Sequence, residues 1–104
     1  MEVNIDNIDE EINDSEKPVF ALFWASWCTA CKRSEVTVSE IEEERDDIKV
    51  IEANVDKNMG LRDKFDIKGV PTFITFNGGE EVDRKVGAQG KRQLTKMIDE
   101  VVNK

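Results

Sequence analysis

The stretch FWASWCTACK, residues 23–32, holds both cysteines of this 104-residue chain, Cys28 and Cys31, where a run of apolar residues ends. Two thiols so close together have three ordinary uses: a structural disulfide, a pair of metal ligands, or a redox couple that opens and closes during turnover. The rest of the sequence bears on which of these uses applies.

The composition is that of one globular domain, which we expect to span residues 1–104. The chain is 38% hydrophobic and 37% charged, and its length suffices for one modest core. A formal charge of −8 disfavours contact with nucleic acid and with anionic membranes. The first residues have no signal-peptide pattern, and no apolar run is long enough to cross a bilayer. We therefore expect a cytoplasmic protein that works as a monomer.

The apolar pattern and the turn signals predict a regular succession of strands and helices. Segments predicted as strands are found at residues 3–5, 17–25, 49–56, 71–76 and 81–86. Segments that favour helix are found at residues 8–13, 28–45, 58–65 and 91–103. The predicted order is β-α-β-α-β-α-β-β-α, with NGG as a tight hairpin between the last two strands. This order indicates an α/β fold of three layers, with helices on both faces of a central mixed sheet.

The cysteines are predicted to lie where a helix follows a buried central strand. The first N–H groups of a helix lack partners and carry a partial positive charge, which stabilises a thiolate and lowers the pKa of a thiol there. Cys28, at the tip, gains most from this effect, and Cys31 is expected to be more buried. Residues three apart share a helix face, so Cys31 is able to attack a mixed disulfide formed on Cys28.

The two other uses of the cysteines have less support. A disulfide between residues three apart closes too small a loop to constrain the unfolded chain much. A closed zinc site needs four ligands, and the chain has no histidine, so two copies would have to share their cysteines to bind zinc or an iron–sulfur cluster. We therefore expect a redox couple, with no metal and no bound cofactor.

The sequence resembles the thioredoxin family over nearly its whole length. The resemblance is carried by W-x-x-W-C-x-x-C-K in residues 24–32, by V-P-T in residues 70–72, and by the stretches ANVDKN, KGVPTFITFNGGEEV and KVGAQGKRQL. It implies the thioredoxin fold and a protein disulfide reductase, with Cys28 as the nucleophile and Cys31 as the resolving thiol. It further implies a cis-proline opposite the cysteines and a shallow substrate groove, whose residues would be Trp27, Gly69, Val70, Pro71, Gly87 and Ala88.

The chain departs from the family between and behind the cysteines. Thr29 and Ala30 stand where thioredoxins usually carry Gly-Pro. Val36 stands in place of the proline that kinks the active-site helix, so this helix is expected to run straighter.

Two further departures concern the handling of protons. Leu22 stands where thioredoxins bury an aspartate, and Glu52 stands where they carry a lysine on the neighbouring strand. Because these two positions are neighbours in the family, we expect burial to raise the pKa of Glu52 and let it accept the proton of Cys31. The alternative is that Glu52 reaches the margin of the sheet and pairs with a lysine.

Taken together, these observations predict a thiol–disulfide oxidoreductase that reduces disulfides in protein substrates. The chain has no nucleotide- or flavin-binding motif, so a separate thioredoxin reductase is expected to supply its electrons. Two alternatives stay open. One is a thioredoxin-fold adaptor whose cysteines turn over poorly, and the other is a dedicated electron donor to one partner enzyme.

Overall fold

A computed structural model describes residues 1–103, and it has the predicted order of elements. The elements are β1 (Glu2–Val3), α1 (Ile8–Asn13), β2 (Val19–Trp24), α2 (Thr29–Glu44), β3 (Lys49–Asn54), α3 (Leu61–Lys64), β4 (Thr72–Asn77), β5 (Glu80–Val86) and α4 (Lys91–Val102). The predicted domain also includes Lys104, which lies outside the described residues.

Several elements are shorter than predicted because turns take the place of their first or last residues. The first strand ends at Val3, since the side-chain oxygen of Asn4 accepts hydrogen bonds from the N–H groups of Asp6 and Asn7. Asn54 ends β3 in the same way. The third helix begins only at Leu61, after Gly60 has turned the chain with a φ of 93° that favours glycine.

The five strands form one mixed sheet in the order β1-β3-β2-β4-β5. β1, β3 and β2 run parallel, whereas β4 is antiparallel to both β2 and β5. β2 lies at the centre, which agrees with its continuously apolar sequence, because a central strand is covered on both faces.

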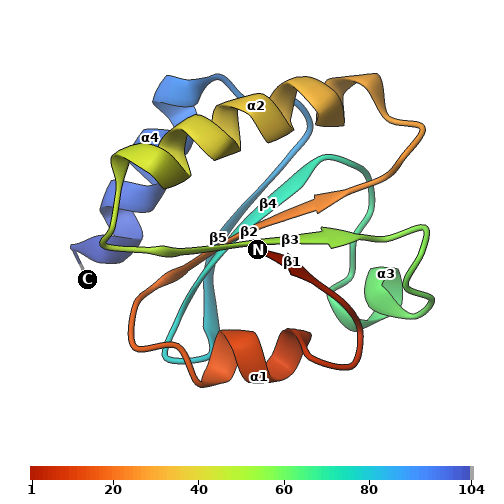
Figure 1. Ribbon diagram of the computed structural model, residues 1–104, viewed down its shortest axis with the longest axis horizontal. Coiled ribbons are helices and arrows are strands. Elements are labelled where there is room, and N and C mark those ends of the chain that lie inside the picture. Colours follow the sequence, from red (N-terminus) through yellow and green to blue (C-terminus); the bar gives the residue numbers. More distant parts are fainter. Residues whose placement is uncertain (104) are drawn as a thin grey trace.

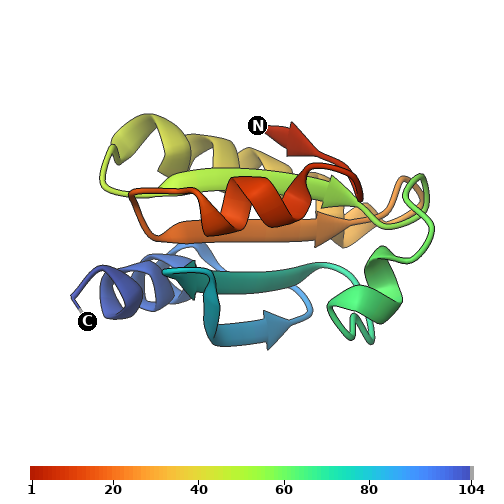
Figure 2. The ribbon, with the colours of Figure 1, turned by 90° about the horizontal axis from the view of Figure 1, so that it is seen from below.

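Helices cover both faces of the sheet, as Figures 1 and 2 show: α1 and α3 lie on one side, and α2 and α4 on the other. Alternate residues of β2 supply the two hydrophobic clusters. Ala21 and Phe23 belong to the cluster under α1 and α3, and Phe20 and Leu22 to the cluster under α2 and α4. The three-layer prediction is confirmed. None of the helices within residues 1–103 has the length and apolarity needed to cross a membrane.

The strand directions gather four loops at one edge of the sheet. Trp24 at the end of β2 is paired with Asn54 at the end of β3, and Thr72 at the start of β4 is paired with Val86 at the end of β5. Thr72 also pairs with Phe23, near the end of β2. The loops that follow β2, β3 and β5 and the loop that precedes β4 therefore meet where α2 begins. The second helix continues through Val36 without interruption.

The buried hydroxyl of Thr75, in β4, is expected to lower the stability of the fold. Thr75 is 0% exposed, and its hydroxyl has no hydrogen-bond partner among residues 1–103. Because a buried hydroxyl without a partner is costly, Thr75→Val should raise the free energy of unfolding by about 1 kcal/mol, measured by urea denaturation. Thr75→Ser keeps the hydroxyl and loses the methyl group, so it should be less stable than the wild type. A loss of stability in Thr75→Val would contradict this assignment.

Candidate active site

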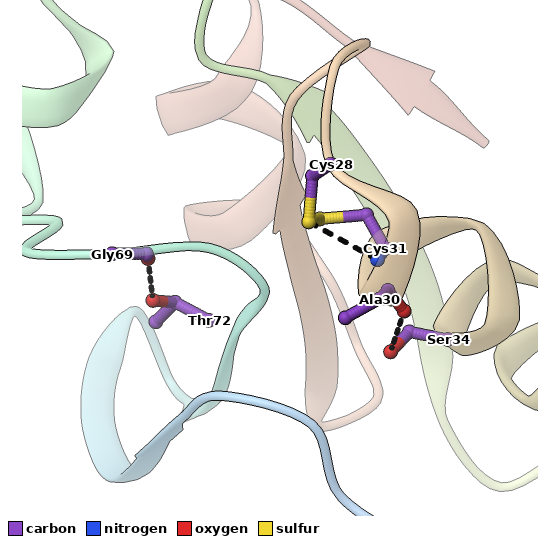
Figure 3. The surroundings of a disulfide bond; sticks show 6 residues. All are labelled: Cys28, Ala30, Cys31, Ser34, Gly69 and Thr72. Atoms are coloured by element: carbon purple, nitrogen blue, oxygen red, sulfur yellow. Dashed lines mark hydrogen bonds between the residues drawn. A yellow bond between two sulfur atoms is a disulfide. The ribbon is translucent and has the colours of Figure 1, made fainter.

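The two cysteines form a disulfide at the start of α2 (Figure 3). Cys28 is the N-cap residue, in an extended conformation, and Cys31 lies in the first turn, with 5.2 Å between the two Cα atoms. The backbone N–H of Cys31 donates a hydrogen bond to the Sγ of Cys28 over 3.1 Å. Cys28 is 6% exposed and Cys31 1%, so the order of exposure is the predicted one although both are buried.

This geometry favours negative charge on Cys28. When the disulfide is reduced, the Cys31 N–H and the partial positive charge of the helix start both face the sulfur of the N-cap residue. Cys31 lies one turn into the helix and is 1% exposed, and these effects are weaker there. The two thiols of the pair are therefore chemically unequal.

The loop before β4 lies beside the disulfide. Val70 packs against the hydrophobic cluster that includes both cysteines, and Figure 3 shows Gly69 and Thr72 on the side toward which the sulfur atoms point. The Thr72 hydroxyl donates to the Gly69 carbonyl over 2.6 Å and closes the turn. The Val70–Pro71 peptide bond is cis, as the resemblance predicts.

The remaining groove residues come from the other loops at this edge. The N–H of Gly87 donates to the carbonyl of Pro71 over 2.8 Å, which joins the loop after β5 to the loop before β4. Ala88 lines a surface groove together with Ala30, the residue directly before Cys31. Trp27 is 68% exposed, directly before Cys28. All six predicted groove residues thus lie in the loops around the disulfide.

Asn54 links two of these loops, a role that the sequence analysis missed. It is 2% exposed, and its side-chain amide donates to the Ser26 hydroxyl, two residues before Cys28. Its side-chain oxygen accepts from the N–H groups of Asp56 and Lys57 over 2.8 and 3.2 Å. An Asn-x-Asp pattern directly after a strand is typical of such a turn and is the signal that would have revealed this residue.

Glu52 lies on β3 beneath α2, half-buried, with Leu22 of β2 and Glu2 of β1 as its neighbours across the sheet. Burial raises the pKa of Glu52, in the predicted direction, and the nearby carboxylates of Glu2 and Glu35 raise it further. Burial also raises the pKa of Glu2. The sequence did not reveal Glu2 as a neighbour, since a strand of two residues has no periodic pattern.

The contacts of Glu52 bear on the two alternatives for this residue, a proton acceptor for Cys31 or an ion pair with a lysine. Within the described part of the chain, Glu52 forms no ion pair with a lysine, and no hydrogen bond joins it to either cysteine. Among residues 1–103, no three acidic or cysteine side chains are grouped closely enough to hold a metal ion.

The raised pKa of Glu52 predicts how stability depends on pH. A carboxyl whose folded pKa lies above its ordinary value of 4.5 stabilises the fold below that pH and loses this contribution as the pH rises through the raised pKa. Glu52→Gln should therefore become more stable relative to the wild type as the pH rises from about 4 to 7. Melting temperatures measured across this range test it. Glu43→Gln, on the exposed side of α2, is the matched control and should show no such trend.

Comparisons with known proteins agree with this geometry. The thioredoxin family model matches residues 1–100. A thioredoxin of Acidithiobacillus ferridurans is 37% identical over 98 residues, which are 93% of this chain and 91% of that protein. A thioredoxin of Rickettsia felis is 34% identical over 94 residues, 89% of this chain and 90% of the relative.

A third relative is longer. A bifunctional thioredoxin reductase/thioredoxin of Mycobacterium leprae is 37% identical over 103 residues, 98% of this chain, and the chain spans only 22% of that protein's length. The matched family, the relatives of similar length and the disulfide at the start of α2 lead to one conclusion. The chain belongs to the thioredoxin family and is a thiol–disulfide oxidoreductase.

Proposed function

We propose that this chain reduces disulfides in protein substrates through two successive exchanges. The Cys28 thiolate attacks one substrate sulfur, the substrate S–S bond breaks, and the other sulfur leaves as a thiolate that takes up a proton. The Cys31 thiolate then attacks the Sγ of Cys28 and releases the second substrate thiol. The substrate gains two electrons, and the Cys28–Cys31 dithiol becomes the disulfide.

The hydrogen bond from the Cys31 N–H to the Sγ of Cys28 carries this assignment of roles. It stabilises negative charge on Cys28, so that this residue is the one that attacks the substrate disulfide as a thiolate. The greater exposure of Cys28 also makes it the first sulfur that a substrate meets. Cys31, buried one turn later, is placed for the second attack.

The substrate segment is proposed to lie against the loops around the disulfide. Trp27 offers a large exposed apolar surface next to the nucleophile, and such a side chain in a soluble protein often marks a contact site. The backbone of the loop before β4 provides polar groups for an extended segment. The residues assigned to this contact are Trp27, Gly69, Val70, Pro71, Gly87 and Ala88.

The dithiol must be restored by an external donor, which we propose to be a separate thioredoxin reductase. The relative that combines a reductase and a thioredoxin in one protein supports this pairing. A reducing compartment is needed for such a cycle, so we place the protein in the cytoplasm and propose that it acts as a monomer. In this role it serves electron transport and the maintenance of cellular thiols.

Glu52 is proposed to accept the proton that Cys31 loses. A half-buried carboxyl with a raised pKa is a better base than an exposed one, and Leu22 offers no alternative on the neighbouring strand. Glu52→Gln should therefore slow resolution of a mixed disulfide about tenfold or more at neutral pH, measured by rapid quench. Alkylation of Cys28 by iodoacetamide should proceed at nearly the wild-type rate. Equal resolution rates in the two proteins would remove Glu52 from the mechanism.

Serine variants test the division of labour between the cysteines. Cys31→Ser, mixed in reduced form with a disulfide-containing protein, should accumulate a covalent adduct that mass spectrometry detects and dithiothreitol releases. Cys28→Ser should form no adduct, and only the wild type should accelerate reduction of the substrate by dithiothreitol. Adducts on Cys28→Ser alone would reverse the roles. A wild type that binds the substrate without accelerating its reduction would indicate an adaptor.

A further inference from the structure

Arg33 and Glu35, two residues of opposite charge, flank the start of α2. Along α2, successive residues turn by about 100°, so Arg33 and Glu35 point to different sides of the helix. The carboxylate of Glu35 lies close enough to Glu2 and Glu52 to raise the pKa of both, which places it over β1 and β3. Arg33 instead borders the loop that leads into α4. Glu35 therefore lies on the β1 side of α2, where the N-terminal ammonium and Lys57 are also close, and Arg33 lies on the α4 side.

Arg33 lines a surface groove that includes Ala30, the residue directly before Cys31. The groove has a volume of about 270 Å³, and its walls are the first turns of α2 and residues 88–90. Ala30, which lies between the two cysteines, and Ala88 form its end nearest the disulfide. No aspartate or glutamate of the described chain lines it, although 23 of the 104 residues are acidic.

The other polar groups of the groove are engaged within the protein. The hydroxyl of Ser34 donates to the carbonyl of Ala30 over 3.0 Å, as Figure 3 shows. The hydroxyl of Thr37 donates to the carbonyl of Arg33 over 3.3 Å. The side-chain amide of Gln89 is directed to the carbonyl of Gly87 over 3.4 Å. Among the described residues that line the groove, Arg33 has the one charged side chain, and its guanidinium is left to interact with a bound molecule.

Arg33 also differs from the paired arginines of the chain. Arg45 forms ion pairs with Asp47 and Asp99, and Arg84 forms one with Glu81. Within residues 1–103, the guanidinium of Arg33 has no ion pair and no hydrogen bond, and the residue is exposed. Two of its N–H donors can bind the two oxygens of one carboxylate at the same time.

We propose that Arg33 selects substrates with an aspartate or glutamate close to the reacting disulfide, an inference that rests on the proposed reductase function. The acidic side chain of the substrate enters the groove between α2 and residues 88–90 and pairs with the guanidinium. Arg33 thereby sets both the preference for acidic segments and the direction in which they lie.

Peptides of known sequence provide the test. Each peptide carries one intramolecular disulfide, and members of a set differ only in having Glu, Gln or Lys at one of the three positions on either side of a cysteine. The reduced protein is mixed with each peptide, the reaction is quenched with acid, and the second-order rate constant is obtained by chromatography. At the best position, the wild type should reduce the Glu peptide about two- to fivefold faster than the Gln peptide, with the Lys peptide slowest.

Substitutions of Arg33 test its part in this preference. Arg33→Gln should bring the rate constants of the Glu and Lys peptides close together, and Arg33→Glu should reverse their order. Lys17→Glu makes the same change of charge at the far end of β2, about 20 Å away, and should keep the wild-type preference. The preference should also shrink in 1 M salt, where charges are screened within about 3 Å.

The outcomes separate this inference from the proposed function. If the wild type reduces the Glu, Gln and Lys peptides at equal rates, the function stands and the acidic preference is overturned. If Lys17→Glu alters the preference as much as Arg33→Glu, net charge and not Arg33 is responsible, and the assignment is overturned. If not even the Gln peptides are reduced, the proposed reductase function fails, and this inference fails with it.

Discussion

Burial of β2 on both faces is the constraint on which the rest of the structure depends. Its alternate side chains enter the two hydrophobic clusters, so helices have to cover both faces of the sheet at this strand. A strand held in this way has a fixed end, and β2 ends at Trp24. The position of Cys28, four residues later at the start of α2, follows from that end. The core thus determines where the reactive sulfur lies.

The order of the elements could be predicted from the sequence because its signals are local: a continuous apolar run, turn residues and one amphipathic helix. The pairing of β1 with β3 could not, because two residues carry no periodicity, and with it the proximity of Glu2 to Glu52 was missed. The cysteine pair and its place at a helix start were predictable for the same local reason. The groove at Arg33 was not, since the charges of a helix surface look alike until its neighbours are known.

The departures from the family redistribute charge beneath α2. An apolar Leu22 replaces the acid on the central strand, and the neighbouring strand carries Glu52 in place of a cation. The result is a half-buried carboxyl on β3, Glu52, whose pKa burial raises and whose charge is costly there. This cost to the folded state is the kind of local conflict that is typical of functional positions.

The hydrogen bonds of Asn54 have a consequence for the motion of the active-site edge. One buried side chain holds the loop before Cys28 through Ser26 and the loop after β3 through Asp56 and Lys57. Neither loop can open fully without breaking these bonds, so the two form one cooperative unit of local unfolding, whose amides exchange their hydrogens together. A contact that orders one loop therefore also restricts the motion of the other, through the side chain of Asn54.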